Sequence, residues 1–241
     1  MSEPLRILAI ECATSLASAA ALRGTRVVAE REVAGGQHVE TLLVLVDGVL
    51  EEAGVGLEDV EAFAVSRGPG AFTSLRVGLA TIKGLAFGSD RPVAGISTLA
   101  ALAWEVSERK PSGLPVAALL DARRGDCYAA VYRRDAEVLK PVLAAGVYSA
   151  EDLASRLPAD CHVVGSGADL YADALDAVAD APGGRVLEPG RSPHARVVGV
   201  LGAHALERGE GVLANVLEPD YLRGADAELP REPAGHPRGR S

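Results

Sequence analysis

The sequence predicts an α/β protein built from two related lobes. Three observations lead to this fold class. Each half of the chain begins with a short apolar run that ends in an acid, Leu5–Glu11 and Val116–Asp121. Each run is followed by a hairpin signal, and helical and strand-like segments then alternate. Because this order occurs twice, we expect an N-terminal lobe at residues 1–108 and a C-terminal lobe at 109–223, with a cleft between them.

The elements of the first half follow from hydrophobic periodicity and from turn and cap residues. A buried strand is expected first, two mixed strands then flank the turn at Arg23–Thr25, and helices alternate with strands after that. Ser97 is a favourable N-cap for the last helix. The expected elements are Leu5–Ile10, Ser18–Leu22 and Arg26–Val33 (strands), His38–Ala53 (helix), Val60–Ser66 (strand), Arg67–Thr73 (loop), Ser74–Phe87 (helix), Pro92–Ile96 (strand) and a helix through Glu108.

The second half begins after a polar segment, Arg109–Leu114, that contains proline and glycine. A strand and a hairpin partner are expected first, and helices and strands then alternate. Ser192 and Pro193 suit the N-cap and the first position of the last helix, which runs through Glu207. The other expected elements are Val116–Asp121 and Cys127–Arg133 (strands), Ala150–Leu157 (helix), His162–Gly165 (strand) and Ala168–Ala179 (helix). Residues 224–241 lack apolar periodicity and predict a disordered tail.

The composition excludes several classes of protein. Hydrophobic residues make up 48% of the chain, which favours a packed globular protein. Aromatic residues make up only 4% and the net charge is -9, so a nucleic-acid-binding platform of its own is not expected. The cysteines Cys12, Cys127 and Cys161 form no CxxC pair, which argues against a disulfide framework and a zinc site. Since no apolar run reaches about 18 residues, we expect no signal peptide or membrane span, and a cytoplasmic location.

The acids at the ends of the two first strands are candidate nucleotide-binding residues. Glu11 is followed by small hydroxyl residues, including Thr14, and Asp121 ends the equivalent strand. Such groups can hold a hydrated Mg²⁺ and phosphate oxygens. The plainer interpretation, which the residues alone favour, is a polar strand-to-turn transition in which the hydroxyls satisfy backbone groups.

The segment Arg67–Arg76 combines two glycines and a proline with the start of a predicted helix. Glycine and proline permit a sharp turn and a close backbone approach. The free N–H groups of the helix could receive an anion. The alternative is a tight strand-to-helix connection that Thr73 or Ser74 caps.

The helix His38–Ala53 predicts a protein partner because it is apolar nearly all round. Its expected core stripe comprises Leu42, Leu43, Val46, Val49 and Leu50, together with Val39. Outside the stripe, Gly48 costs about 1 kcal/mol relative to alanine, and a closely packed helix would explain it. The alternative is that the C-terminal segment covers this face. The predicted interface residues are Thr41, Val44, Leu45 and Gly48, with Leu75, Arg76, Leu79 and Lys83 of the next helix.

Motifs along nearly the whole chain resemble those of the TsaB (YeaZ) family. RGPGAFTSLRVGLATIKGLAFG at 67–88 is similar to the family segment RGPGSFTGVRIG…KGLA, and ILAIECATS at 7–15 is similar to its ILAIDTAT start. Four further strings follow in the family order: GISTLAALA, LLDARRGDCYAAVY, VVGSGA and EPDYLR. The chain departs from the family at Glu11, where aspartate is usual.

The resemblance implies a duplicated actin-like ATPase fold of the ribonuclease H-like (ASKHA) type. It also implies a role in making N6-threonylcarbamoyladenosine beside the tRNA anticodon. The family acts with the catalytic paralogue TsaD and with TsaE. For this chain it implies a homodimer in isolation, pairing with TsaD through the first-lobe helices, and contact with tRNA only through the complex. Weak ATP or ADP binding, in the cleft or at the complex interface, is the only cofactor interaction expected.

A comparison with TsaD predicts that the chain is a non-catalytic subunit. TsaD carries two metal-binding histidines four residues apart, and the corresponding positions here are Thr98 and Leu102, which cannot replace imidazole ligands. No two of the chain's histidines have that spacing. We therefore expect no catalytic residue and no metal ligand. The alternative is a weak ATPase or a metal-independent peptidase of the same fold, with Glu11 and Asp121 essential for hydrolysis.

Overall fold

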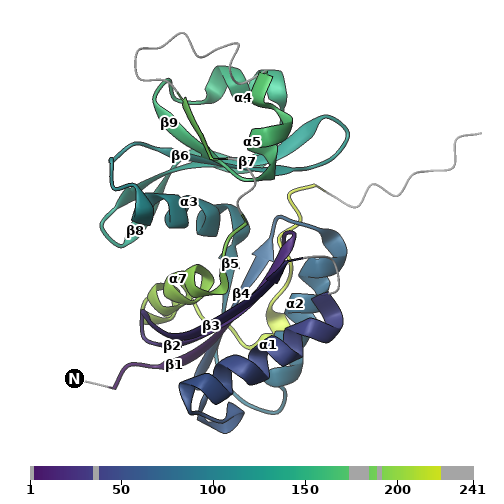
Figure 1. The fold of residues 1–241 in the computed structure, drawn as a ribbon, viewed down its shortest axis with the longest axis vertical. Coiled ribbons are helices and arrows are strands. Elements are labelled where there is room, and N and C mark those ends of the chain that lie inside the picture. The colour runs from purple at the N-terminus through teal and green to yellow at the C-terminus, as the bar shows by residue number, and fades with distance from the viewer. Residues whose placement is uncertain (1–2, 35–37, 174–184, 189–191, 224–241) are drawn as a thin grey trace, which may run out of the picture.

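The computed structural model describes residues 3–34, 38–173, 185–188 and 192–223, which form two stacked lobes with a five-stranded sheet each (Figure 1). The strand order is β3-β2-β1-β4-β5 in the first sheet and β8-β7-β6-β9-β10 in the second. The second order is the first with every number raised by five. This repeat confirms the predicted duplicated, actin-like α/β fold.

Each sheet combines an antiparallel meander with parallel strands. The strand that opens each lobe, β1 or β6, pairs antiparallel with the next strand and parallel with the one after the meander. The first sheet contains β1 (Arg6–Glu11), β2 (Leu16–Arg23), β3 (Arg26–Ala34), β4 (Ala62–Gly68) and β5 (Val93–Ser97). The second contains β6 (Val116–Asp121), β7 (Asp126–Asp135), β8 (Val138–Ser149), β9 (Cys161–Val164) and β10 (Arg185–Glu188).

Helices cover both faces of the two sheets (Figure 1). Because strand side chains alternate, Leu8 of β1 packs with α1 and α2 while Ile7 packs with α7. In the second lobe, Leu119 packs with α4 and α5 while Leu120 packs with α3. The described helices are α1 (His38–Ala53), α2 (Phe72–Leu85), α3 (Thr98–Arg109), α4 (Ala150–Arg156), α5 (Ser166–Leu170) and α7 (Ala195–Glu207), with short 3-10 helices η1 (Leu57–Asp59) and η2 (Ala214–Val216).

Helices α3 and α7 exchange between the lobes. Helix α3 follows the first sheet in sequence but covers the second, and α7 follows the second sheet but covers the first. Trp104 on α3 also packs against the α7 side of the first core. Glu105 of α3 accepts from Arg196 of α7 at 2.9 Å and lies 2.8 Å from Nδ1 of His194. The division at residues 108 and 109 therefore remains a prediction about sequence order, while the packing interlocks the two parts.

Two of the predicted helix starts are wrong. Helix α2 begins at Phe72, and its N-cap Ala71 makes no side-chain cap, so Thr73 and Ser74 lie inside the helix. Helix α7 begins at Ala195 rather than after Ser192. Its first N–H groups are satisfied from the first sheet: Ser18 Oγ accepts from Ala195 N–H at 2.9 Å, and Glu30 Oε1 from Arg196 N–H at 3.0 Å. Since tertiary contacts supply these caps, local sequence signals did not show them.

The predicted Ser97 cap of α3 is confirmed, because its side chain accepts from Ala100 N–H. Strands β8 and β10 were missed. Strand β8 carries Lys140 and Pro141 and is largely exposed, and its pairing with β7 contains irregularities, so it lacks a clean alternation. The predicted helix Ala168–Ala179 is α5 in part. Its residues beyond 173, like the predicted tail 224–241, lie outside the described residues.

Candidate functional site

The acid at the end of β1, Glu11, is fully buried. Its Oε1 accepts a hydrogen bond from the backbone N–H of Ala13 at 2.7 Å. Burial raises the pKa of Glu11 from its usual 4.5 to about 7, although hydrogen bonds with Ser66 and Ala13 and the charge of His194 oppose this rise. A magnesium ligand must be ionised and must face the ion. The structure gives Glu11 a role in the turn after β1, while its nucleotide-binding role would require the ionised acid and stays a prediction.

The loop after β4 covers this turn. The backbone N–H of Ala71 donates to the carbonyl oxygen of Ala13 at 2.8 Å. A Cβ placed on Gly70 would lie 2.3 Å from the same oxygen, so this approach requires glycine. Thr14, the second predicted nucleotide ligand, follows Ala13 in the same turn, and its hydroxyl oxygen is buried. The glycine-rich segment thus packs on the chain's own turn.

The third predicted nucleotide ligand, Asp121 at the end of β6, makes the same local bond as Glu11. Its Oδ1 accepts from the backbone N–H of Arg123 at 2.7 Å, and its Oδ2 lies 3.3 Å from the guanidinium of that residue. Ser166 Oγ accepts from the N–H of Asp121 at 3.2 Å. Ser166 is the first residue of α5, just after β9, whereas Ser66 lies inside β4 in the first lobe. Both strand-end acids therefore act first as turn-stabilising acceptors.

The outer face of α1 is apolar and exposed. The exposed fractions of Leu43 and Val44 are 50% and 66%. Helix α2 packs beside α1, and Phe72 and Phe87, at its start and just after its end, are also exposed. We call these four residues the docking face. Exposed large apolar side chains such as the adjacent Leu43 and Val44 are typical of surfaces that another protein covers.

Three of the predicted interface residues lie inside the chain. Leu45, Leu75 and Leu79 are buried in its own core, and their place at an interface stays a prediction. Leu43, predicted as core, is exposed instead. The buried stripe of α1 runs through positions 42, 45, 46, 49 and 50, which keeps the helical spacing of three and four. The sequence contains two apolar stripes on this helix, and only packing selects one.

The other predicted interface residues have contacts inside the chain. Arg31 of β3 lies over Gly48, where a Cβ would come 2.2 Å from its guanidinium, so the close approach at this glycine is internal. Thr41 and Lys83 are half-buried, and Arg76 is exposed. Arg76 donates to the hydroxyl of Tyr221 at 3.1 Å. Of the predicted set, Val44 is the apolar side chain that the structure leaves exposed.

The C-terminal segment, which the sequence analysis considered as a cover for the helix at 38–53, joins the two lobes. The N–H of Asp220 donates to the carbonyl oxygen of Arg67 at 2.7 Å, and Tyr221 stacks against Phe72 with ring centroids 5.6 Å apart. Arg223 then donates to the carbonyl oxygen of Ala122 at 2.9 Å and pairs with Asp126. The EPDYLR string at residues 218–223 was the sequence feature that could have indicated the role of this segment. The segment contacts the start of α2 and leaves the exposed residues of α1 open.

The positions that correspond to the metal-binding histidines are part of the packing. Thr98 and Leu102 are both buried at the start of α3. Among the residues that the structure describes, no group of three or more His, Cys, Asp or Glu side chains is placed to hold a metal ion. Within the same residues, no helix is long and apolar enough to cross a membrane.

Comparisons with known proteins decide the family. The tRNA threonylcarbamoyladenosine biosynthesis protein TsaB of Escherichia coli (strain K12) is 32% identical over 231 residues, which cover 91% of this chain and 95% of that protein. The crystal structure of YeaZ from Pseudomonas aeruginosa superimposes with a TM-score of 0.81 at 32% identity, covering 90% of this chain and all of that one.

The chain belongs to the TsaB (YeaZ) family. A family model described as TsaD, tRNA N6-adenosine threonylcarbamoyltransferase, also matches residues 28–229. The similarity to TsaD proteins themselves is shorter. The tRNA N6-adenosine threonylcarbamoyltransferase of Geobacter sp. (strain M21) is 38% identical over 88 residues, which cover 36% of this chain and 26% of the enzyme. The chain therefore matches TsaB of Escherichia coli over nearly its whole length, the TsaD family model over residues 28–229 and the Geobacter enzyme over 88 residues.

Proposed function

We propose that this chain is a non-catalytic subunit in the biosynthesis of N6-threonylcarbamoyladenosine in tRNA, where it binds and activates the catalytic subunit TsaD. The names of its relatives support the pathway. The pathway transfers a threonylcarbamoyl group to N6 of the adenosine next to the anticodon. TsaE is the second proposed partner, and tRNA contacts this chain only through the complex.

The observation that carries the proposal is the docking face on α1 and α2. Val44 is 66% exposed in the middle of a helix whose opposite side is fully packed. Burying apolar side chains of this size stabilises a complex by about 1.5–3 kcal/mol each when they become fully covered. Leu43 beside it doubles the patch. The same face serves a second copy of the chain in isolation, and TsaD competes for it.

The absence of imidazole at two key positions supports a non-catalytic role. Thr98 and Leu102 replace the histidines that TsaD uses, and both side chains are packed in the core. Glu11 is likewise buried with a raised pKa. The two positions that hold metal-binding histidines in TsaD thus carry no metal-binding side chain here, which supports a subunit without catalytic activity.

The binding step can be tested with Val44→Asp. A carboxylate at the centre of an apolar interface is desolvated without a partner, so we expect the affinity for the TsaD of the same organism to fall by about 100-fold or more. Titration calorimetry measures this affinity, and sedimentation velocity measures the homodimer. The matched control is Val142→Asp on β8, since Val142 is a valine of similar exposure on the second lobe.

Activation is measured separately by reconstitution with TsaD, TsaE, the adenylate-forming enzyme and tRNA, followed by nucleoside analysis. We expect no modified nucleoside from the chain alone, and a loss of product with Val44→Asp but not with Val142→Asp. Equal affinities for the two variants would contradict the proposed face. ATP or peptide hydrolysis by the isolated chain, abolished by Glu11→Ala, would favour the enzymatic alternative.

A further inference from the structure

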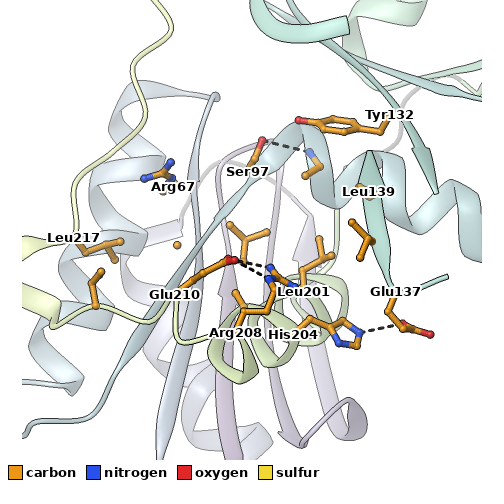
Figure 2. Close-up of a pocket in the computed structure, with 16 residues that line it drawn as sticks. Arg67, Ser97, Tyr132, Glu137, Leu139, Leu201, His204, Arg208, Glu210 and Leu217 are labelled. Atoms are coloured by element: carbon orange, nitrogen blue, oxygen red, sulfur yellow. Dashed lines mark hydrogen bonds and ion pairs between the residues drawn. The ribbon is translucent and has the colours of Figure 1, made fainter. Parts of the chain in front are cut away.

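A pocket with a volume of about 460 Å³ lies between the lobes and has no place in the proposed function (Figure 2). Its walls come from the ends of β4 and β5, the start of α3, the β7–β8 hairpin, and α7 with the segment after it. Neither Glu11 nor Asp121 lines it. Its volume is in the range of pockets that bind small molecules.

Both acids that line the pocket lie close to basic side chains of the chain itself. Glu210 accepts two hydrogen bonds from Arg208, at 2.6 and 2.9 Å. Glu137 lies 3.1 Å from Nε2 of His204. The dashed lines in Figure 2 mark both pairs. These charges are therefore engaged with each other and leave little negative field for a cationic ligand.

Arg67 is different, because its guanidinium forms no ion pair with any residue in the described part of the chain. Its stem lies against Gly95, where a Cβ would come 2.9 Å from Cδ of Arg67. The glycine thus lets the arginine lie along the pocket wall. An arginine held without an acid, in a chain with a net charge of -9, leaves a local positive charge.

The first turn of α3 adds to the positive potential that Arg67 creates in the pocket. Ser97 and Ala100 line the pocket beside Arg67, and Figure 2 shows Ser97 on the same side as Arg67. Tyr132 also lines the pocket and adds a second hydroxyl group. Helix N-termini favour anions because their N–H groups and dipole point outward. Arg67, two hydroxyl groups and a helix start therefore converge at one end.

The rest of the lining is mainly apolar. Ile96, Leu139, Leu201 and Leu217 contribute aliphatic surface from four different elements. We propose that the pocket binds a small amphipathic carboxylate, with the carboxylate on Arg67 and the start of α3 and an apolar body against these side chains. One unpaired cation suits a single negative charge.

The probe is 4-phenylbutyrate, titrated into the full-length ¹⁵N-labelled chain, with neutral 4-phenylbutyramide as its uncharged counterpart. We expect the carboxylate to shift the amide resonances of Ser97, Ala100 and His204, and the amide compound to bind at least about tenfold more weakly. Arg67→Gln should weaken the carboxylate by about tenfold or more, as for a charged hydrogen bond, and leave the amide unchanged.

The matched control is Arg26→Gln, an exposed arginine on β3 away from the pocket, which should leave both affinities unchanged. Ala100→Leu, which fills the pocket, should weaken both compounds. The inference is overturned if Arg67→Gln binds the carboxylate as wild type does, if the shifts are confined to α1 and α2, or if ATP shifts the same amides at lower concentration. None of these outcomes depends on complex formation with TsaD, so this test and that of the proposed function fail separately.

Discussion

The two lobes repeat one turn but bury it differently. Glu11 and Asp121 each end the first strand of a lobe and accept from the N–H two residues further on, at 2.7 Å in both cases. Glu11 is 0% exposed, whereas the Asp121 side chain is 22% exposed and pairs with an arginine that is 87% exposed. The shared fold therefore fixes the hydrogen bond, while the two lobes differ in how far they bury the acid that accepts it.

The strongest test of this difference is Glu11→Gln. The folded pKa of about 7 lies above the usual 4.5, so the folded state binds the extra proton between these values. Wild-type stability should therefore fall as pH rises through this window, with the loss complete above about pH 7. Glutamine carries no such proton. We expect the variant to gain about 3 kcal/mol relative to wild type between pH 5 and 8, measured by urea unfolding.

The control in the second lobe is Asp121→Asn. Asparagine keeps an oxygen for the N–H of Arg123 and loses only an exposed ion pair, so we expect a change below about 0.5 kcal/mol at pH 8. If the unfolding free energies of wild type and Glu11→Gln changed with pH in parallel, the pKa of Glu11 would not be raised in the folded state.

Gly70→Ala should disrupt the contact between the loop at residues 67–71 and the turn after β1. The added Cβ would lie 2.3 Å from the backbone oxygen of Ala13, and a backbone atom cannot move away easily. We expect a loss of about 2 kcal/mol in unfolding free energy, as for other overpacked sites. The control is Gly84→Ala on α2, where a Cβ would meet nothing within 4 Å and should stabilise the helix by about 0.5–1 kcal/mol. An equal effect of the two substitutions would reject the close contact.

The smallest expected effect concerns the C-terminal segment. Tyr221→Phe removes the hydroxyl that accepts from Arg76 at 3.1 Å and keeps the ring that stacks on Phe72. Because the pair is exposed, we expect a loss of about 0.5 kcal/mol by thermal unfolding. Phe72→Ala should cost more, since it removes the stacking surface as well, and the reverse order would mean that the hydrogen bond dominates.

The sequence predicted the features that depend on local signals. The apolar strand that ends in an acid in each half of the chain predicted the repeated topology, and Ser97 predicted the start of α3. The apolar excess of α1 foretold an exposed face at Val44. Each of these follows from residue type and spacing along a single element.

The rest depends on contacts between distant residues. Leu43 and Leu45 are both leucine on one helix, and only the packing of α1 on the sheet exposes the first and buries the second. The caps of α7 come from Ser18 and Glu30, more than 160 positions away. The pocket beside Arg67 is lined by four stretches of the chain, at 67, 95–100, 132–139 and 201–217. No spacing in the sequence places such groups together.

The exchange of α3 and α7 determines whether the chain can be divided into two fragments that fold separately. A fragment that ends at residue 108 would carry α3 without the sheet it covers, and would lack α7, so the Ile7 side of its own sheet would face water. The complementary fragment would carry α7 as an unpartnered apolar helix. Neither half is a self-sufficient folding unit, and the two should regain native structure only when expressed together.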